Sequence, residues 1–346
     1  MRLLAVRLTS LGDVVHAIPA VAALRRTFPA ARIDWLVGDR CRELVELVPV
    51  VDRCLVTPTL RAAAAFPRLV RTLRAARYDA AIDLQGLLKS AVLARGSGAR
   101  RVIGFGRGQV RERAARLLYT ESPASGSPGH VIDKNLALVA ALGVERQPAE
   151  FPIAETPTDV VERAREGLGV RGARGFALLN PGAAWTSKCW PPERFGELAR
   201  RLRRERDLPS VVAWGPGERE RAARVVAASD AAAVPAPPTR VADLVALARA
   251  AEVMVAGDTG PLHIAAALGT PVVGLYGPTD PCRNGPWSPA DIVVSRHGAC
   301  GCRRDPSASA GVVVRRCAQA SPCISAIPVD EVAEAAYRRL DVADDA

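Results

Sequence analysis

The amino-acid sequence predicts an α/β protein built of two doubly wound parallel-sheet domains in tandem, facing a central cleft. Short apolar segments alternate with helical patterns along the chain, and this alternation is typical of parallel βαβ units. The alternation restarts near the middle of the chain, after a region rich in proline and glycine. The length of 346 residues is more than one ordinary hydrophobic core accommodates, so two domains are expected.

The first half is expected to form an N-terminal domain, residues 1–155. Its predicted strands are 2–8, 32–37, 53–57, 79–84 and 101–105. Helical patterns lie between and after them, for example at 14–27, 61–76 and 131–142. Proline and glycine predict a loop at 121–130 and a linker at 143–159.

The second half repeats the pattern and is expected to form a C-terminal domain, residues 156–327. Its predicted strands are 175–182, 209–215, 251–257, 271–277 and 291–295. Its predicted helices are 192–206, 217–228, 239–249 and 260–268. A last helix at about 328–340 opens a third segment, 328–346, for which the N-terminal domain is a candidate packing surface.

The net charge of +11 favours an anionic partner, such as nucleic acid, an acidic membrane surface or a phosphorylated substrate. Arginine supplies all but three of the 47 basic residues, so an arginine-rich genome explains the same balance. An aromatic content of 4% and the lack of a recognised module argue against nucleic acid. Because the sequence has neither a run of about 18 apolar residues nor a signal-peptide pattern, we expect a cytoplasmic protein with reduced cysteines.

The sequence has no pattern typical of a metal site. It has no D-x-D acid pair to hold a metal–diphosphate and no G-x-x-x-x-G-K-[ST] loop. Cys300, Cys302, Cys317 and Cys323 form a C-x-C…C-x5-C pattern, which is not the usual zinc spacing. We therefore expect no metal and assign no role to these cysteines.

The loops that follow predicted strands are the candidates for chemistry, because ligands of such sheets bind beyond the carboxyl ends of the strands. The first of these loops contains Gly12, Asp13 and His16, and the glycine allows a close approach of backbone to ligand. Asp13 is either a cap of the following helix or a general base. His16, one turn further on, is either a core residue or a second polar group at the ligand.

Two loops of the second half carry further polar side chains. Lys188 follows the strand at 175–182 with Thr186 and Ser187 beside it, and an ammonium next to hydroxyl groups suits a diphosphate. Since the chain has only three lysines, we favour a functional Lys188 over a solvated surface residue. Glu218 opens the next helix, where it either complements the helix dipole or holds ribose hydroxyls.

The stretch GDTGPLHIAAALG, residues 257–269, opens a helix with Asp258, Thr259 and Gly260 and places His263 in an apolar face. Unpaired N–H groups at a helix N-terminus, next to a glycine, suit a phosphate. A capped core helix with a satisfied histidine explains the same residues without a ligand. The turn GLYGPTDP follows the next strand, so two adjacent loops are expected to cradle a diphosphate.

Four segments together carry a resemblance: SLGDVVHAIPA, IDLQGLLKSA, NPGAAWTSKCWPPERF and GDTGPLHIAAALGTPVVGLYGPTDP. Over nearly its whole length the chain resembles the ADP-heptose:lipopolysaccharide heptosyltransferases of glycosyltransferase family 9, and most of all the type that adds the first heptose. The resemblance implies the GT-B fold, with two Rossmann-like domains. The N-terminal domain would bind the acceptor and the C-terminal domain the nucleotide-sugar donor.

The same resemblance implies inverting transfer of L-glycero-D-manno-heptose to a Kdo sugar of lipid A–Kdo. ADP-heptose would be the co-substrate, and neither metal nor cofactor would be required. The anionic lipid acceptor implies a peripheral position at the inner face of the cytoplasmic membrane. Two alternatives are a second-heptose transferase and another nucleotide-sugar-dependent GT-B glycosyltransferase acting on a cell-envelope glycan.

For the donor and the reaction, the resemblance implies a role for each motif residue. Asp13 would be the base that deprotonates the acceptor, and Lys188 would neutralise the diphosphate. The remaining donor contacts would come from Glu218, Asp258, Thr259, Gly260 and His263. One departure is that Ala183 and Ala184 stand where the family has two phosphate-contacting threonines, so Thr186 and Ser187 are the candidate substitutes.

For the acceptor, the candidates are His16 and basic residues of the first half. Arginine suits the phosphates and carboxylates of an anionic lipid. The alternative for each arginine is a solvated face. The candidates are Arg61, Arg68, Arg71, Arg74 and Arg107.

Overall fold

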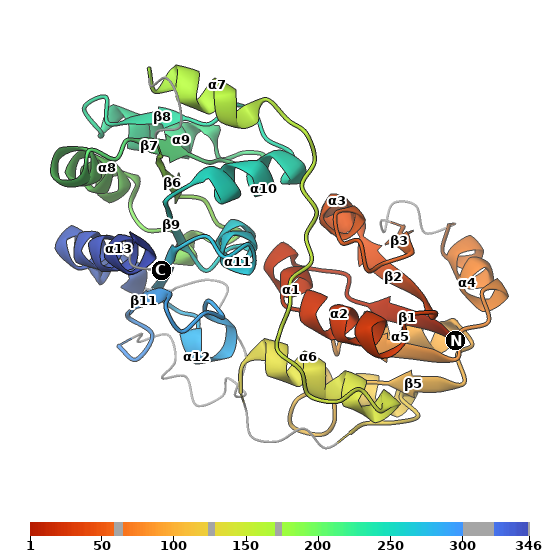
Figure 1. Ribbon diagram of the computed structural model, residues 1–346. Coiled ribbons are helices and arrows are strands. Elements are labelled where there is room, and N and C mark those ends of the chain that lie inside the picture. The colour runs from red at the N-terminus through yellow and green to blue at the C-terminus, as the bar shows by residue number, and fades with distance from the viewer. Residues whose placement is uncertain (59–64, 124–128, 170–174, 300–321, 345–346) are drawn as a thin grey trace. The chain divides into compact units, whose positions relative to one another are not determined.

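The computed structural model describes residues 1–58, 65–123, 129–169, 175–299 and 322–344 (Figure 1). The chain divides into two compact units, Met1–Ala154 and Glu155–Ala346. Each unit contains one parallel sheet, as predicted for a doubly wound α/β protein.

The first unit has a five-stranded sheet in the order β3-β2-β1-β4-β5. Its strands are β1 (Arg2–Val6), β2 (Arg32–Gly38), β3 (Arg53–Thr57), β4 (Ala80–Asp83) and β5 (Arg101–Ile103). Its α-helices are α1 (Leu11–Val15), α2 (Ile18–Thr27), α3 (Arg42–Glu46), α4 (Phe66–Ala75), α5 (Leu88–Gly96) and α6 (Val131–Val139). Short 3-10 helices include η1 (Asp39–Cys41), η3 (Arg113–Leu118) and η4 (Ala140–Leu142).

One prediction for this unit needs correction. The expected single helix at 14–27 is two helices, α1 and α2, because Pro19 lies in the first turn of α2. Proline lacks an N–H and is tolerated there but not inside a continuous helix. For the helix expected at 61–76, residues 61–64 lie outside the described chain, and α4 begins at Phe66 with Pro67 in its first turn.

The second unit has a six-stranded sheet in the order β11-β10-β9-β6-β7-β8. Its strands are β6 (Ala177–Asn180), β7 (Ser210–Val212), β8 (Ala233–Pro235), β9 (Val253–Gly257), β10 (Val272–Tyr276) and β11 (Ile292–Ser295). Its α-helices are α7 (Val160–Gly167), α8 (Pro192–Arg206), α9 (Arg219–Ala227), α10 (Val241–Ala250), α11 (Gly260–Ala267), α12 (Pro281–Asn284) and α13 (Val329–Asp344). Its 3-10 helices include η5 (Thr186–Lys188) and η7 (Cys323–Ala326).

The last helix, α13, packs on α8 and on strands β9 to β11 of this same sheet. Its apolar face lies in the core of the second unit, through Val332, Ala333, Ala335, Ala336 and Leu340. The segment 328–346, predicted to stand apart from the C-terminal domain, therefore contributes α13 to the core of the second unit. In the part of the chain that the structure describes, no helix is long and apolar enough to cross a membrane.

Both sheets have a point where the chain reverses its direction of winding. In the first unit β1 pairs with β4, and in the second β6 pairs with β9, although each pair is far apart in sequence. Ligands of open α/β sheets bind beyond the carboxyl ends of such neighbouring strands. The loops after β1, β4, β6 and β9 are therefore where a site is expected.

Candidate functional site

In the second unit, the switch point brings together three predicted site residues and one that was not predicted. Lys188 lies in the loop after β6 and Asp258 directly after β9, and the Nζ–Oδ2 distance is 2.5 Å. The other carboxylate oxygen, Oδ1, lies 3.0 Å from His263 Nε2. Asn284, the last residue of α12, donates to the same Oδ1 at 2.7 Å. We call these four residues the Lys188 cluster.

The cluster holds Asp258 as a carboxylate. Burial opposes its ionisation, but the hydrogen bond from His263 and the charge of Lys188 outweigh burial, so the pKa of Asp258 lies well below its usual range. The folded pKa is thus lower than the unfolded value of about 3.9. The ionised cluster stabilises the fold above that pH, and this contribution is lost as the pH falls through the folded pKa.

Lys188 is positioned but not enclosed. Its side chain keeps 16% exposure, and Nζ lies 4.8 Å from the centroid of the Trp185 ring. An ammonium has three N–H donors, of which one meets Asp258 Oδ2 and a second faces the Asp258 backbone carbonyl at 3.5 Å. The remaining N–H donor of Lys188 suits an anionic oxygen beyond the carboxyl edge of the sheet.

Three buried hydroxyls adjoin this edge without a hydrogen-bond partner among the described residues: Ser187 Oγ, Thr259 Oγ1 and Thr279 Oγ1. They lie in the loops after β6, β9 and β10 respectively. Buried hydroxyls are normally paired, so each is a candidate contact to a ligand. Thr259 also precedes α11, whose first-turn N–H groups favour an anion.

Glu218 reaches the same edge from the turn before α9. Its Oε2 accepts a hydrogen bond from the Gly215 N–H at 2.9 Å. Its carboxyl group also lies against Gly182, in the turn after β6, where a Cβ would be 2.2 Å from it. The glycine therefore allows the carboxylate to sit beside the loop that leads to Lys188.

In the first unit, Asp13 lies in the first turn of α1, after β1. Its Oδ2 accepts hydrogen bonds from the backbone N–H (3.1 Å) and the hydroxyl (3.0 Å) of Ser10. Its Oδ1 pairs with Arg7 at 2.5 Å and with Arg111 at 3.2 Å. The cap of α1 is Ser10, and Asp13 is its capping-box partner, three residues on.

Asp13 is therefore ionised. Burial opposes ionisation, but the charges of Arg7 and Arg111 outweigh it and hold the pKa of Asp13 well below its usual range. Arg7 is almost completely buried and also donates to the Leu84 carbonyl, at the end of β4. The carboxylate keeps 19% exposure, so one edge of it is open to a ligand.

Family comparison agrees with this geometry. The model of Glycosyltransferase family 9 (heptosyltransferase) matches residues 66–311, which is more than half of the chain. The chain belongs to glycosyltransferase family 9. It is similar to Lipopolysaccharide heptosyltransferase 1 of Pseudomonas aeruginosa, with 33% identity over 304 residues, 84% of this chain and 83% of the relative. Identity to the protein of the same name in Escherichia coli is 30%, covering 81% and 89%.

Solved structures confirm the fold class of this glycosyltransferase as GT-B. The structure of E. coli heptosyltransferase WaaC with ADP-2-deoxy-2-fluoro heptose matches with a TM-score of 0.75 at 24% identity, covering 100% of both chains. The structure of E. coli ADP-heptose LPS heptosyltransferase II matches with a TM-score of 0.77 at 22% identity, again covering 100% of both.

Of the remaining predicted residues of the glycosyltransferase, Gly12 lies on α1 with Asp13, His16 caps the end of α1, and the arginines belong to other elements or lie outside the described chain. Gly12 is buried within α1. His16 is buried, with its ring edge-on to that of His130 at 5.5 Å between centroids. Arg107 is exposed in the turn after β5, and Arg61 lies outside the described residues. Arg68, Arg71 and Arg74 are exposed on α4.

Arg7, Arg111, Thr279 and Asn284 were not predicted from the sequence. The chain contains many arginines, and no local sequence pattern distinguishes Arg7 and Arg111 from the others. Thr279 lies in the turn GLYGPTDP, so its place after a strand was a usable signal. Asn284 reaches Asp258 only because β10 lies beside β9, which sequence spacing does not reveal.

No metal site is added by the described residues, since they contain no group of three or more His, Cys, Asp or Glu side chains able to hold an ion. Cys300, Cys302 and Cys317 lie outside the described part of the chain. Cys323 is half-buried in η7.

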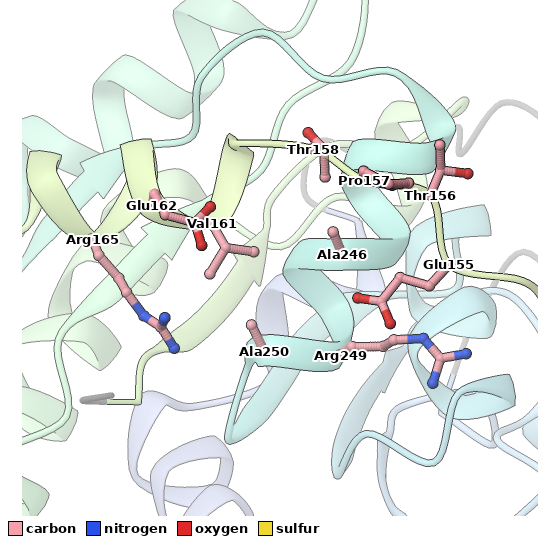
Figure 2. Close-up of a pocket in the computed structure, with 10 residues that line it drawn as sticks. All are labelled: Glu155, Thr156, Pro157, Thr158, Val161, Glu162, Arg165, Ala246, Arg249 and Ala250. Carbon is pink, nitrogen blue, oxygen red and sulfur yellow. The ribbon is translucent and has the colours of Figure 1, made fainter. Parts of the chain in front are cut away.

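The second unit also has a cavity of about 550 Å³ between residues 155–158, α7 and α10 (Figure 2). None of its lining residues belongs to the Lys188 cluster. Its lining charges are two glutamates and two arginines, so it selects neither a phosphate nor a cation. We do not place a substrate there.

A glycine at the end of β9 gives a test of how tightly the Lys188 loop is held. A Cβ on Gly257 would lie 2.6 Å from the backbone carbonyl oxygen of Lys188. Since that oxygen is backbone, Gly257→Ala must displace the loop, and we expect a loss of about 1–3 kcal/mol in the free energy of unfolding. Denaturant unfolding measures it. Gly298→Ala, whose Cβ meets nothing within 4 Å, is the matched control, and equal losses would contradict the tight contact.

Proposed function

We propose that this glycosyltransferase moves L-glycero-D-manno-heptose from ADP-heptose to a Kdo sugar of the lipopolysaccharide inner core, with inversion and without a metal or cofactor. The observation that carries the proposal is the Lys188 cluster at the switch point of the second sheet, beside the N-terminus of α11. Relatives named Lipopolysaccharide heptosyltransferase 1 support the substrate class. A solved relative that holds an ADP-heptose analogue supports the donor.

The second unit would bind the donor through its diphosphate. Lys188 and the first-turn N–H groups of α11 supply positive charge and hydrogen-bond donors to the phosphate oxygens. The unpartnered hydroxyls of Ser187 and Thr259 add neutral donors. Ser187 thereby replaces contacts that Ala183 and Ala184 cannot make. Glu218, held beside Gly182, is placed to accept hydrogen bonds from ribose hydroxyls.

In the transfer step, the Kdo hydroxyl oxygen forms a bond to the anomeric carbon while the bond from that carbon to the diphosphate oxygen breaks. The hydroxyl proton passes to the Asp13 carboxylate, and ADP leaves with the bonding electron pair. Negative charge grows on the leaving oxygen, where a fixed cation stabilises the transition state. Removing one such donor typically costs about 3 kcal/mol.

Asp13 is a weak base in the free enzyme because Arg7 and Arg111 hold its pKa low. It accepts the proton only as the acceptor hydroxyl becomes acidic during attack on the anomeric carbon. Arg111 is the more accessible of its two partners, with 37% side-chain exposure. An anionic acceptor would attract Arg111 and so weaken its hold on Asp13.

Transfer in the presence and absence of a chelator tests metal independence, and the coupling constants of the new glycosidic linkage test inversion. We expect equal rates with EDTA and a product whose anomeric configuration is opposite to that of the donor. Running Kdo2-lipid A beside an acceptor that already carries one heptose separates first from second heptose transfer. A rate restored only by divalent metal, or a retained configuration, would contradict the proposal.

Asn284 gives a pH-dependent test of the Lys188 cluster. Asn284→Asp places a second carboxyl beside Asp258, and two adjacent carboxylates raise the pKa of one of them. When that carboxyl is protonated, it can donate to Asp258 as the asparagine amide does. We therefore expect the ratio of variant to wild-type kcat to rise as the pH falls from about 8 to about 5.5.

Asn284→Ala is the control for this prediction, because it removes the donor without adding a titrating group. Its ratio to wild type should stay level over the same pH range. A level ratio for Asn284→Asp as well would show that Asn284 does not act on Asp258 during transfer.

A further inference from the structure

Two elements of the first unit that pack against each other, α5 and η3, carry exposed apolar side chains. Six large apolar side chains are exposed among the described residues, and three of them lie here: Leu88 (42%), Val92 (52%) and Leu117 (88%). Single exposed apolar residues are ordinary, but a group on one surface of a chain needs an explanation.

The packing of α5 explains why its apolar residues face outward. Ser90, Ala91, Leu93 and Ala94 are buried, so Leu88 and Val92, one turn apart, form part of the opposite stripe. The element η3 packs against α5. Glu112, which precedes η3, accepts a hydrogen bond from the Leu88 N–H at 2.6 Å and fixes the two elements together.

The same elements carry four exposed cations: Lys89, Arg95, Arg113 and Arg116. None of the four forms a salt bridge with another described residue. Glu112 contributes one negative charge and accepts a hydrogen bond from the backbone of α5, so these elements keep an excess of exposed positive charge. Apolar side chains flanked by an excess of cations are the pattern of a protein surface that meets an anionic membrane.

We propose that this α5–η3 surface (Leu88, Val92 and Leu117 with Lys89, Arg95, Arg113 and Arg116) docks on an anionic lipid bilayer. Its position supports that occupant, because Arg111, two residues before η3, pairs with Asp13. A lipid acceptor anchored in the bilayer would therefore present its sugar next to the carboxylate. The presentation of an acceptor to Asp13 rests on the proposed function. Binding of the chain to a bilayer does not require turnover and can be measured separately.

The test is co-sedimentation of the full chain with vesicles that contain no acceptor. We expect binding to phosphatidylglycerol–phosphatidylcholine vesicles, weakened by salt, and little binding to phosphatidylcholine alone. Leu117→Asp should reduce binding about tenfold or more, since it removes an apolar contact and adds a negative charge. Val342→Asp makes the same charge change at a 51%-exposed site in the second unit and should leave binding unchanged.

A second variant, Arg113→Gln with Arg116→Gln, keeps the test valid if Leu117→Asp folds poorly, and it should also weaken binding. Transfer to a deacylated, water-soluble acceptor should be unaffected by Leu117→Asp, whereas transfer to vesicle-bound acceptor should fall. Equal loss in the Leu117 and Val342 variants, or wild-type binding that ignores lipid charge, would overturn the proposal. So would a dimer in light scattering that Leu117→Asp dissociates, because the surface would then join two copies of the chain.

Discussion

Asp13→Asn is expected to reduce kcat for heptose transfer by about 10²–10⁴-fold while leaving the affinity for ADP nearly unchanged. The asparagine keeps the size of the side chain and can accept the hydrogen bonds from Ser10, but it loses the ion pair with Arg7 and cannot take the acceptor proton. Asp13 belongs to the first unit and the proposed donor contacts belong to the second, so the loss should fall on kcat. Steady-state kinetics and calorimetric titration with ADP measure the two quantities.

The pH profile of the wild-type enzyme checks the same role. Because the pKa of Asp13 is held well below its usual range, the carboxylate stays ionised, and Asp13 should cause no fall in kcat/KM between about pH 8 and pH 5. Asp39→Asn, at an exposed carboxyl of the same unit, is the matched control for lost charge. Near-normal turnover in Asp13→Asn would reduce Asp13 to a capping-box partner and counter-ion of Arg7.

Lys188→Ala is expected to lower kcat by about 10²–10³-fold and to weaken donor binding, because it removes the cation that we propose faces the leaving diphosphate. It also leaves the buried Asp258 carboxylate without its cation, which typically costs about 3–5 kcal/mol of stability. Steady-state kinetics should therefore show the lower kcat, and thermal unfolding should show the loss of stability. Arg163→Ala, which removes an exposed cation on α7, should change neither.

The double variant Lys188→Ala with Asp258→Asn separates the two effects. Removing both charges should restore much of the stability, since no unpaired buried charge remains, but it should not restore transfer. A double variant that regains activity along with stability would show that Lys188 supports the fold and does not act on the diphosphate.

The fold was largely predictable because apolar alternation and turn residues report local structure. The predicted strands at 2–8, 32–37 and 271–277 correspond to β1, β2 and β10. The failures arose where a short feature or a distant contact decided the outcome. Strand β8 was missed because it has only three residues and ends in Pro235. The break between α1 and α2 depends on the position of a single proline, Pro19.

The site was predictable only in part, for a related reason. Lys188 and Asp258 could each be chosen because they follow strands. Their contact depends on β6 lying beside β9, and that order emerges only when the sheet forms. Asn284 joins Asp258 through the same ordering of strands. Arg7 carries no local signal in an arginine-rich chain, although it is the buried partner of Asp13.

Heptose transfer itself can be measured by mass spectrometry of Kdo2-lipid A after incubation with the purified protein and ADP-heptose. We expect a gain of one heptose unit with ADP-heptose, in the presence of EDTA, and none with UDP-sugars. If no heptose is gained although ADP-heptose binds the protein, the donor site stands and the proposed acceptor is wrong. A gain from a UDP-sugar, with neither transfer nor binding of ADP-heptose, would contradict the heptosyl account itself.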